Sequence, residues 1–296
     1  MRVFVTGATG FIGSALVPEL IQAGHQVLGL ARSDAAAASL TAAGAEPHRG
    51  SLDDIESLRR GAAGVDGVIH AGFIHDFSKF AENSEIDRRA ILALGEALAG
   101  SDRPLIVTSG VGVTPGRDRT EEDAPNPPSS VVPRASEQAA SIAESQSASI
   151  RVVRLPQVHD QERQGLITYA IAIARERGVS AYIADGLNRM PAVHRLDAAR
   201  LYRLVLERGS PGTRYHAVAE EGVPVREIAE AIGRRLNVPV ISKSPEEAGA
   251  HFGWLGGIMG FDMPASSTLT QERLNWRPTG PGLVSDIDRQ AADAQS

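Results

Sequence analysis

The first thirteen residues of the chain place a short apolar strand directly before a glycine-rich turn and a helix. Residues 3–5 fit the strand, residues 6–13 form the turn, and an apolar helical pattern begins at Ser14. This order constrains the fold strongly, because it is the layout that presents a helix N-terminus to a pyrophosphate group. We therefore expect the chain to begin with a phosphate-binding strand–turn–helix unit.

The three glycines of this turn have separate physical roles in such a unit. The first permits a tight turn, the second lets backbone N–H groups approach the phosphates, and the third lets the helix pack close to the strand. A plain strand-to-helix connection is the alternative, but a second strand over 25–30 completes a βαβ unit and favours dinucleotide binding. The expected contacts with the dinucleotide in this turn are Gly7, Thr9, Gly10, Phe11, Ile12 and Gly13.

The residues after the second strand indicate which dinucleotide the unit prefers. An acidic residue usually binds the ribose 2′-hydroxyl of NAD at this point, whereas this chain has Arg32 and Ser33. A guanidinium group with a neighbouring hydroxyl suits a 2′-phosphate. The two residues therefore predict NADP(H) in preference to NAD(H), with an ordinary solvated loop arginine as the alternative.

Composition argues against several other classes of function. The chain has 296 residues, a net charge of −6 and no cysteine. There is no basic run to support a nucleic-acid partner, and without cysteine there is no disulfide or thiolate metal site. No apolar run of about eighteen residues supports a membrane span, and no clustered ligand motif supports a metal site. We expect a cytoplasmic protein without a membrane or nucleic-acid partner.

Helical and strand patterns alternate along the first half of the chain. This alternation predicts an α/β fold, namely a Rossmann-type doubly wound parallel sheet with a smaller C-terminal substrate-binding region. Ligands of such sheets lie at the carboxyl ends of the strands. Strands are expected over 67–70, 104–108 and 150–154, and helices over 52–61, 84–98 and 133–145.

The same pattern suggests how the chain divides into domains. Residues 1–156 are expected to form the NAD(P)-binding domain, and residues 190–219 are expected to return to its sheet. Residues 157–189 and 220–296 are then left for the substrate-binding region. At the carboxyl edge of the sheet, the further expected contacts with the dinucleotide are His70, Ala71, Gly72, Thr108 and Pro156.

Several short segments, in the right order, resemble the extended short-chain dehydrogenase/reductase superfamily and its NAD-dependent epimerase/dehydratase-like group. The resemblance covers nearly the whole chain and implies a homodimer through the helices around 86–98 and 134–143. It also implies adenine contacts at Ser51 and Leu52, although Ser51 stands where the group usually has an aspartate. The matching segments are 6–13 (TGATGFIG), 68–71 (VIHA), 107–109 (VTS), 154–156 (RLP), 186–188 (GLN), 193–197 (VHRLD) and 276–278 (WRP).

The largest departure from the group concerns its Tyr-x-x-x-Lys pair. The flanking Pro128 and Glu137 place Ser129 in the tyrosine position and Pro133 in the lysine position. A serine hydroxyl is a far weaker acid than a phenol, and proline has no side-chain donor. The pattern therefore resembles the atypical branch of the superfamily, and the candidate catalytic residues are Ser109, Ser129 and Arg134.

Several other side chains in the expected substrate region have both a functional and a structural interpretation. His75, Asp76, Tyr169, Tyr182 and His194 suit the lining of a pocket, but each also suits a solvated or structural role. The acidic run 121–123 suits a solvated loop or a mobile flap. An apolar wall for a hydrophobic substrate, or else a small core, is expected from Phe252, Trp254, Met259 and Phe261.

These features favour one function and leave two alternatives. We expect an NADP-dependent oxidoreductase that reduces a small carbonyl, imine or alkene substrate with a non-standard proton donor. The missing Tyr-Lys pair leaves open a redox-inactive NADP-binding sensor that binds a partner. The resemblance leaves open a nucleotide-sugar epimerase or dehydratase.

Overall fold

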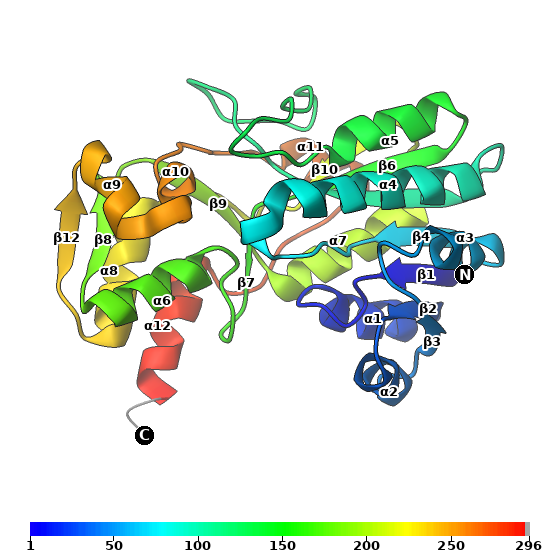
Figure 1. The fold of residues 1–296 in the computed structure, drawn as a ribbon, viewed down its shortest axis with the longest axis horizontal. Coiled ribbons are helices and arrows are strands. Elements are labelled where there is room, and N and C mark those ends of the chain that lie inside the picture. Colours follow the sequence, from blue (N-terminus) through cyan, green and yellow to red (C-terminus); the bar gives the residue numbers. More distant parts are fainter. Residues whose placement is uncertain (294–296) are drawn as a thin grey trace.

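A seven-stranded parallel sheet forms the centre of the molecule in the computed structural model, which describes residues 1–293 (Figure 1). The α/β fold expected from the sequence is confirmed, and the inner strands are short, apolar and largely buried, as strands covered on both faces must be, whereas the edge strand over 46–49 is polar and has no buried residue. In spatial order the strands are β10 (Thr213–His216), β6 (Ser149–Leu155), β5 (Pro104–Gly110), β4 (Gly67–His70), β1 (Arg2–Thr6), β2 (Gln26–Ala31) and β3 (Glu46–Arg49).

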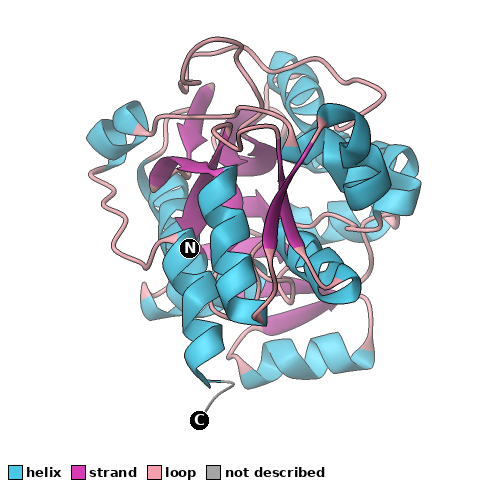
Figure 2. Ribbon diagram, turned by 90° about the vertical axis from the view of Figure 1, so that its left-hand side faces the viewer, coloured by secondary structure: helices cyan, strands magenta, loops and turns pink. Residues whose placement is uncertain are grey.

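Helices cover both faces of this sheet (Figure 2). One apolar core lies under α1 (Gly13–Gln22), α2 (Asp34–Ala42) and α7 (Arg195–Arg208). A second core lies on the opposite face, under α3 (Ile55–Ala63), α4 (Phe80–Leu98) and α5 (Ser136–Ser145). The carboxyl edge of the sheet is left to loops, which is where such folds bind their ligands.

A smaller part of the chain lies beside the sheet and has its own apolar core (at the left in Figure 1). Of the segment 190–219, β10 joins the main sheet, whereas β9 pairs with β7 and β11 in a separate three-stranded sheet. The division into domains stays a prediction. The elements here are β7 (Gln157–His159), α6 (Ile167–Arg177), β8 (Ser180–Ile183), β9 (Arg189–His194), β11 (Glu220–Pro224), α8 (Val225–Leu236) and β12 (Val240–Lys243).

The tail beyond residue 238 is more regular than its weak periodicity suggests. Ser244 caps α9 (Pro245–Phe252) through a capping box with Glu247. Two short helical pieces, η2 (Gly253–Leu255) and α10 (Gly256–Met259), follow, and then α11 (Thr268–Leu274). The last helix, α12 (Leu283–Asp293), packs Leu283 and Ile287 into the smaller core.

The start of α7 differs from what its local sequence suggests. An aspartate such as Asp197 is a common N-cap, but His194 is the N-cap, and its ring accepts the Leu196 N–H. Asp197 instead lies in the first turn and accepts the backbone N–H groups of Thr279 and Gly280. A local sequence pattern does not report that second set of donors, because they come from more than eighty residues away.

The small residues on α5 serve a contact inside the chain. Ala139, Ala140 and Ala143 are buried, and a Cβ on Gly95 of α4 would lie 2.5 Å from the Ala143 Cβ. Their size therefore allows α4 and α5 to pack closely in one protomer. The homodimer through these helices stays a prediction.

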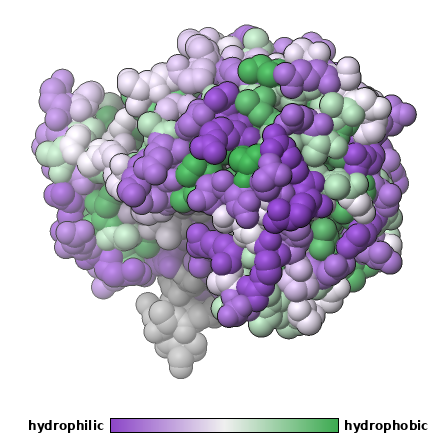
Figure 3. Space-filling view, turned by 45° about the vertical axis from the view of Figure 1, so that its right-hand side comes forward, coloured by the Kyte–Doolittle hydropathy of each residue, from purple (hydrophilic) through white to green (hydrophobic). Residues whose placement is uncertain are grey.

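The described part of the chain offers little for a bilayer or a metal ion. None of its helices is long and apolar enough to cross a membrane. Within residues 1–293, no three His, Cys, Asp or Glu side chains gather in a way that could hold a metal ion. On the face shown in Figure 3, hydrophilic side chains predominate and apolar ones form small separate patches.

Candidate functional site

The glycine-rich turn has no room for side chains at two of its glycines. Gly7 has a φ of +68°, and a Cβ there would lie 2.6 Å from the Gly72 Cα. A Cβ on Gly13 would lie 2.7 Å from the Ala8 Cα and closer still to the Gly7 carbonyl oxygen. Gly10 is exposed, and its N–H donates to the Gly7 carbonyl oxygen at 2.8 Å. The turn is thus a bare backbone surface at the start of α1, which fits a dinucleotide phosphate.

The other residues expected to contact the dinucleotide in this turn divide into exposed and packed positions. Thr9 is exposed, while Phe11 and Ile12 are half-buried and pack against the core. The Arg195 guanidinium lies 5.1 Å from the centre of the Phe11 ring and pairs with Asp160 at 3.1 Å. Sequence reasoning missed Arg195, whose only signal is its position directly after β9.

The adenosine end of the edge has two arginines. Arg32 follows β2 and is exposed, and Arg49 ends β3, where it is paired in register with Ala31. Arg49 forms an ion pair with Asp34, so this acidic side chain is matched by a cation. The Ser33 hydroxyl accepts the Ala36 N–H at 3.2 Å and thereby caps α2.

Ser51 binds a neighbouring carboxylate, that of Asp53. Its hydroxyl donates to the Asp53 carboxylate, and this hydrogen bond lowers the pKa of Asp53. Leu52 is half-buried, and its side chain contacts Gly72, on which a Cβ would lie 3.1 Å away from it. Asp53 was not among the expected residues, although it lies only two positions from Ser51.

A buried polar chain links the glycine-rich turn to α4. His70 is fully buried, with Nδ1 2.9 Å from the Thr6 Oγ1 and Nε2 3.1 Å from the Asp87 Oδ1. Because Thr6 Oγ1 also accepts the Gly72 N–H at 3.2 Å, the consistent arrangement has Thr6 donating to Nδ1 and Nε2–H donating to Asp87. The buried His70 side chain therefore connects the end of β1 to α4, beneath the carboxyl edge of the sheet.

The buried polar chain, that is, this series of hydrogen-bonded side chains, continues from Asp87 to Arg134. Ser136 donates to the Asp87 Oδ2 at 2.6 Å, and Arg134 Nε donates to the Ser136 Oγ at 2.7 Å. Arg134 also lies 3.7 Å from Asp87 and donates to the Thr108 carbonyl oxygen at 3.0 Å. Burial alone would raise the pKa of Asp87, but the Arg134 charge and the hydrogen bonds from His70 and Ser136 lower it. Arg134 is thus held as a cation at the end of β5.

The two hydroxyl residues at the end of β5 point to opposite faces. Thr108 donates to the His70 carbonyl oxygen at 2.7 Å and lies 2.6 Å from the Tyr202 hydroxyl in the buried core. The Ser109 hydroxyl lies on the side of α5, where burial raises the pKa of Glu137 but Arg154, and to a smaller extent Ser109, lower it. Ser129 is exposed on the loop before α5, where its hydroxyl accepts the Val132 N–H at 3.0 Å. Pro156 is half-buried and follows β6 at the same edge of the sheet.

The structure places the other polar candidates in different surroundings. His75 is exposed on one side, yet partial burial and then the nearby Arg134 charge lower its pKa, so the ring is neutral near pH 7. Asp76 bonds the backbone and hydroxyl of Ser78 and caps η1 (Phe77–Lys79). The Arg226 guanidinium carbon lies 5.5 Å from the centre of the Tyr182 ring, over its face.

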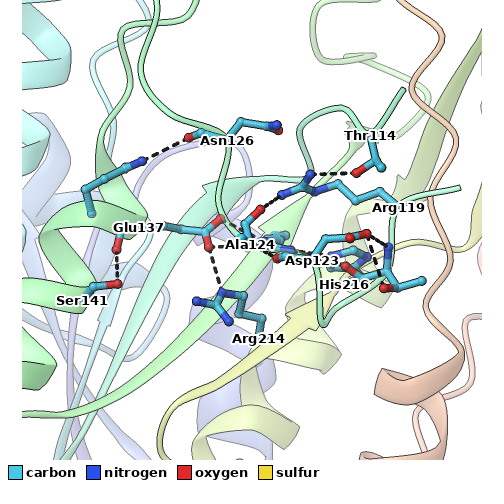
Figure 4. Close-up of polar contacts among 12 residues, drawn as sticks. Thr114, Arg119, Asp123, Ala124, Asn126, Glu137, Ser141, Arg214 and His216 are labelled. Carbon is cyan, nitrogen blue, oxygen red and sulfur yellow. Dashed lines mark hydrogen bonds and ion pairs between the residues drawn. The ribbon is translucent and has the colours of Figure 1, made fainter. Parts of the chain in front are cut away.

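The acidic run 121–123 is not a solvated loop, which corrects that expectation. Glu121 is buried and accepts the Thr270 N–H and hydroxyl at 2.7 Å each, while Asp123 pairs with Arg117. The neighbouring Arg119 is buried as well and donates to the Thr114 hydroxyl and the Ala124 carbonyl (Figure 4). Glu122, between Glu121 and Asp123, stays exposed, and the Thr270 partner of Glu121 lies 149 positions away, so no local pattern reports it.

A buried charged cluster supports the same segment from the sheet. Arg154 is fully buried and forms a two-pronged pair with Glu137 at 2.9 Å for each contact. Glu137 also accepts from Arg214 at 3.1 Å (Figure 4). His216 Nδ1 lies 2.8 Å from the Ser266 carbonyl oxygen and Nε2 lies 3.3 Å from Arg154. The ring must therefore be neutral, with Nδ1–H donating and Nε2 accepting.

The neutral ring of His216 predicts that stability falls in mild acid. Burial lowers its pKa to about 4, so between pH 6.5 and 4 the unfolded chain binds the proton that the folded chain rejects. From this group alone, the free energy of unfolding is expected to drop by about 2 kcal/mol between pH 7 and pH 5. Urea unfolding of the wild type and of His216→Gln at both pH values checks this. Equal losses in the two proteins would contradict it.

The expected apolar wall is only partly present. Phe252 and Met259 are buried in the smaller core, so these two residues form core packing. Trp254 is 48% exposed and Phe261 is 38% exposed. Trp254 contacts the rings of Tyr169 and Phe77, which brings the smaller part of the chain against the segment after β4.

Comparison with known proteins gives a consistent family. Residues 3–218 match the NAD dependent epimerase/dehydratase family. The chain is 48% identical over 299 residues to an uncharacterized protein of Schizosaccharomyces pombe, covering 99% of each. It is 28% identical over 247 residues to the decarboxylating sterol-4-alpha-carboxylate 3-dehydrogenase of Dictyostelium discoideum, covering 76% of this chain and 73% of that one. UDP-glucose 4-epimerase of Thermus thermophilus, solved with NAD, shares the fold with a TM-score of 0.76 at 20% identity, covering 100% of this chain and 99% of that one.

Proposed function

The chain belongs to the NAD dependent epimerase/dehydratase family, and on that premise we propose that it is an NADP-dependent oxidoreductase. Its proposed substrate is a small carbonyl, imine or alkene compound. The observation that carries this proposal is the placement of Arg134, which a buried polar chain fixes at the carboxyl end of β5.

The residues at the edge supply what a reduction needs. NADPH, when bound, supplies the hydride. The backbone of residues 7–13 and the Arg195 guanidinium would hold its pyrophosphate. Arg134 would stabilise negative charge that develops on the substrate oxygen, because it is a fixed cation in a partly desolvated place. The Ser109 hydroxyl, at the carboxyl end of β5, is the proposed proton donor.

The proposed preference for NADP rests on the two arginines at the ends of β2 and β3. Arg32 and Arg49 would face a 2′-phosphate together, and the N-terminus of α2 lies beside them. The double change Arg32→Ala and Arg49→Ala is expected to weaken NADPH binding by about tenfold to a hundredfold, as charge-assisted hydrogen bonds are lost. NADH binding is expected to stay within about threefold.

Fluorescence titration with each nucleotide measures this preference. Arg59→Ala is the matched control, because Arg59 pairs with Glu56 and Glu96 on the surface of α3 and α4. A double variant that loses NADH and NADPH equally would overturn the assignment of these arginines to the 2′-phosphate.

A nucleotide-sugar epimerase or dehydratase is the alternative function that the family leaves open. Such an enzyme regenerates its nucleotide in each cycle and therefore retains it. If NAD stays bound through purification, does not exchange with added nucleotide and is released only by denaturation, the result would support an epimerase and contradict our proposal.

The direct test of the proposed activity is the consumption of NADPH in the presence of a panel of aldehydes, ketones, imines and activated alkenes. We expect turnover with at least one class and a lowered rate in Ser109→Ala. Tight NADPH binding without turnover on any class would overturn the oxidoreductase proposal. It would favour a redox-inactive nucleotide-binding protein instead.

A further inference from the structure

A run of aromatic rings leads away from Arg134 along the segment after β4. The Arg134 guanidinium lies 4.4 Å above the Phe73 ring. The Phe73 ring lies 5.3 Å from His75, and His75 lies 6.1 Å from Phe77, with the rings edge to face. The run therefore connects the fixed cation of the proposed reaction centre to Phe77 in η1.

Phe77 is seated in a right-angled corner that two rings of the smaller part form. Tyr169 of α6 and Trp254 of η2 lie 5.3 Å apart with an interplanar angle of 77°. Phe77 stacks on Trp254 at 4.7 Å and 20°, and meets Tyr169 edge to face at 6.0 Å and 84°. We call Tyr169 and Trp254 the aromatic corner. It already holds one benzyl group in both of the geometries that aromatic pairs prefer.

The aromatic corner keeps much of its surface open despite this occupant. Trp254 is 48% exposed and Tyr169 is 39% exposed, which is high for large rings in contact with one another. Phe77 belongs to a 3₁₀ turn of three residues, and the Asp76 side chain that caps it bonds only within the same segment. The benzyl group that fills the corner is thus attached to a short 3₁₀ turn that leads directly into α4, and not to the part of the chain that forms the corner.

We propose that the aromatic corner binds an aromatic ring of the substrate, and that Phe77 occupies the corner in its place when substrate is absent. The proposal rests on and deepens the proposed function, since the run of rings connects the corner to Arg134. The substrate class is then an aromatic carbonyl compound without a charged group on its ring. Its ring replaces a ring that the corner is already shaped to hold.

A built-in occupant has a thermodynamic signature of its own. Because Phe77 competes with the ligand, it reduces the apparent affinity by the fraction of molecules in which the corner is filled. Removing Phe77 should therefore tighten binding, whereas removing the stacking face of Trp254 should weaken it. If Phe77 only contacted the bound ligand, removing it would weaken binding. The sign of the change in Phe77→Ala therefore distinguishes a competing occupant from a contact residue.

Calorimetric titration of the full chain loaded with NADP⁺ tests this with two matched ligands, benzyl alcohol and cyclohexylmethanol. The wild type should prefer the aromatic ligand by roughly threefold to tenfold, as expected for one aromatic pair. Trp254→Leu keeps an apolar side chain without the ring and should strongly reduce that preference. Phe77→Ala should tighten benzyl alcohol binding by a few-fold and leave the preference in place.

Each outcome bears on the proposal. Weaker benzyl alcohol binding in Phe77→Ala, or the same preference in wild type and Trp254→Leu, would overturn it. Tyr169→Leu is a second variant at the corner and should reduce the preference in the same direction as Trp254→Leu. Two further titrations separate the two proposals: one with NADP⁺ alone, and one with the two alcohols in the absence of nucleotide. A ring preference in a protein that does not bind NADP⁺ would overturn the proposed function and leave the aromatic corner as a ring-binding site.

Discussion

Replacing Arg134 with alanine is expected to lower kcat by about a hundredfold or more on any substrate that the wild type reduces. The expectation follows from the position of the guanidinium, which is fixed by Ser136, the Thr108 carbonyl oxygen and Asp87. Removal of one preorganised group that stabilises an oxyanion costs about a hundredfold to a thousandfold in rate. NADPH binding, measured by fluorescence, should change by less than about fivefold, because Arg134 is not assigned to the phosphates.

Arg88→Ala is a matched control for this experiment. Arg88 lies on α4 one position after Asp87, but its guanidinium pairs with Glu85 at the surface. It should leave kcat and KM unchanged. A kcat of the Arg134→Ala variant within about threefold of the wild type would remove Arg134 from the chemistry.

Replacing Gly13 with alanine is expected to have the largest effect on nucleotide binding. The new Cβ would lie 2.7 Å from the Ala8 Cα and closer still to the Gly7 carbonyl oxygen, so the backbone of the turn must move. We expect NADPH affinity to fall by roughly a hundredfold, because the N–H groups of the turn act only in one arrangement. Isothermal titration with NADPH measures the loss, and circular dichroism checks that the fold is retained.

Gly249→Ala provides the comparison for the loop variant. Gly249 lies in α9, and a Cβ there would meet nothing within 4 Å. It should bind NADPH as the wild type does and gain a little stability from the better helix former. Unimpaired binding in Gly13→Ala would mean that the phosphates do not rest on this turn.

The fold was predictable because its signals are local. The buried strands near residues 3, 68, 105 and 151, and the glycine-rich turn, are each written in a few consecutive residues. The order of the elements then restricts the topology to a doubly wound sheet. The segment beyond residue 238 was less predictable, because its helical pieces are held by distant packing partners: α9, α10 and α12 pack against the smaller core, whereas α11 places Leu274 in a core of the main sheet.

The candidate site was predictable only where the chain marks it directly. The residues of the turn, Arg32 and Arg134 were identified by their places after strands or beside a familiar motif. Arg49, Asp53 and Arg195 were not, because their relevance comes from strand register, a side-chain contact and a long-range approach to Phe11.

The buried polar chain shows the same limit most clearly. Thr6 and His70 are 64 positions apart, and Ser136 is 49 positions from Asp87. Each is an ordinary residue in its own segment. Their joint effect, which is to hold a cation at the end of β5, exists only in the folded sheet.

We propose that one edge of the sheet holds NADPH with its reacting end beside Arg134, and a crystal structure of the protein with NADP⁺ would show this arrangement. We expect the pyrophosphate on residues 7–13, the 2′-phosphate in contact with Arg32 and Arg49, and the nicotinamide ring near Arg134. A nicotinamide ring bound away from Arg134, or a dinucleotide that leaves the turn free, would contradict the proposal.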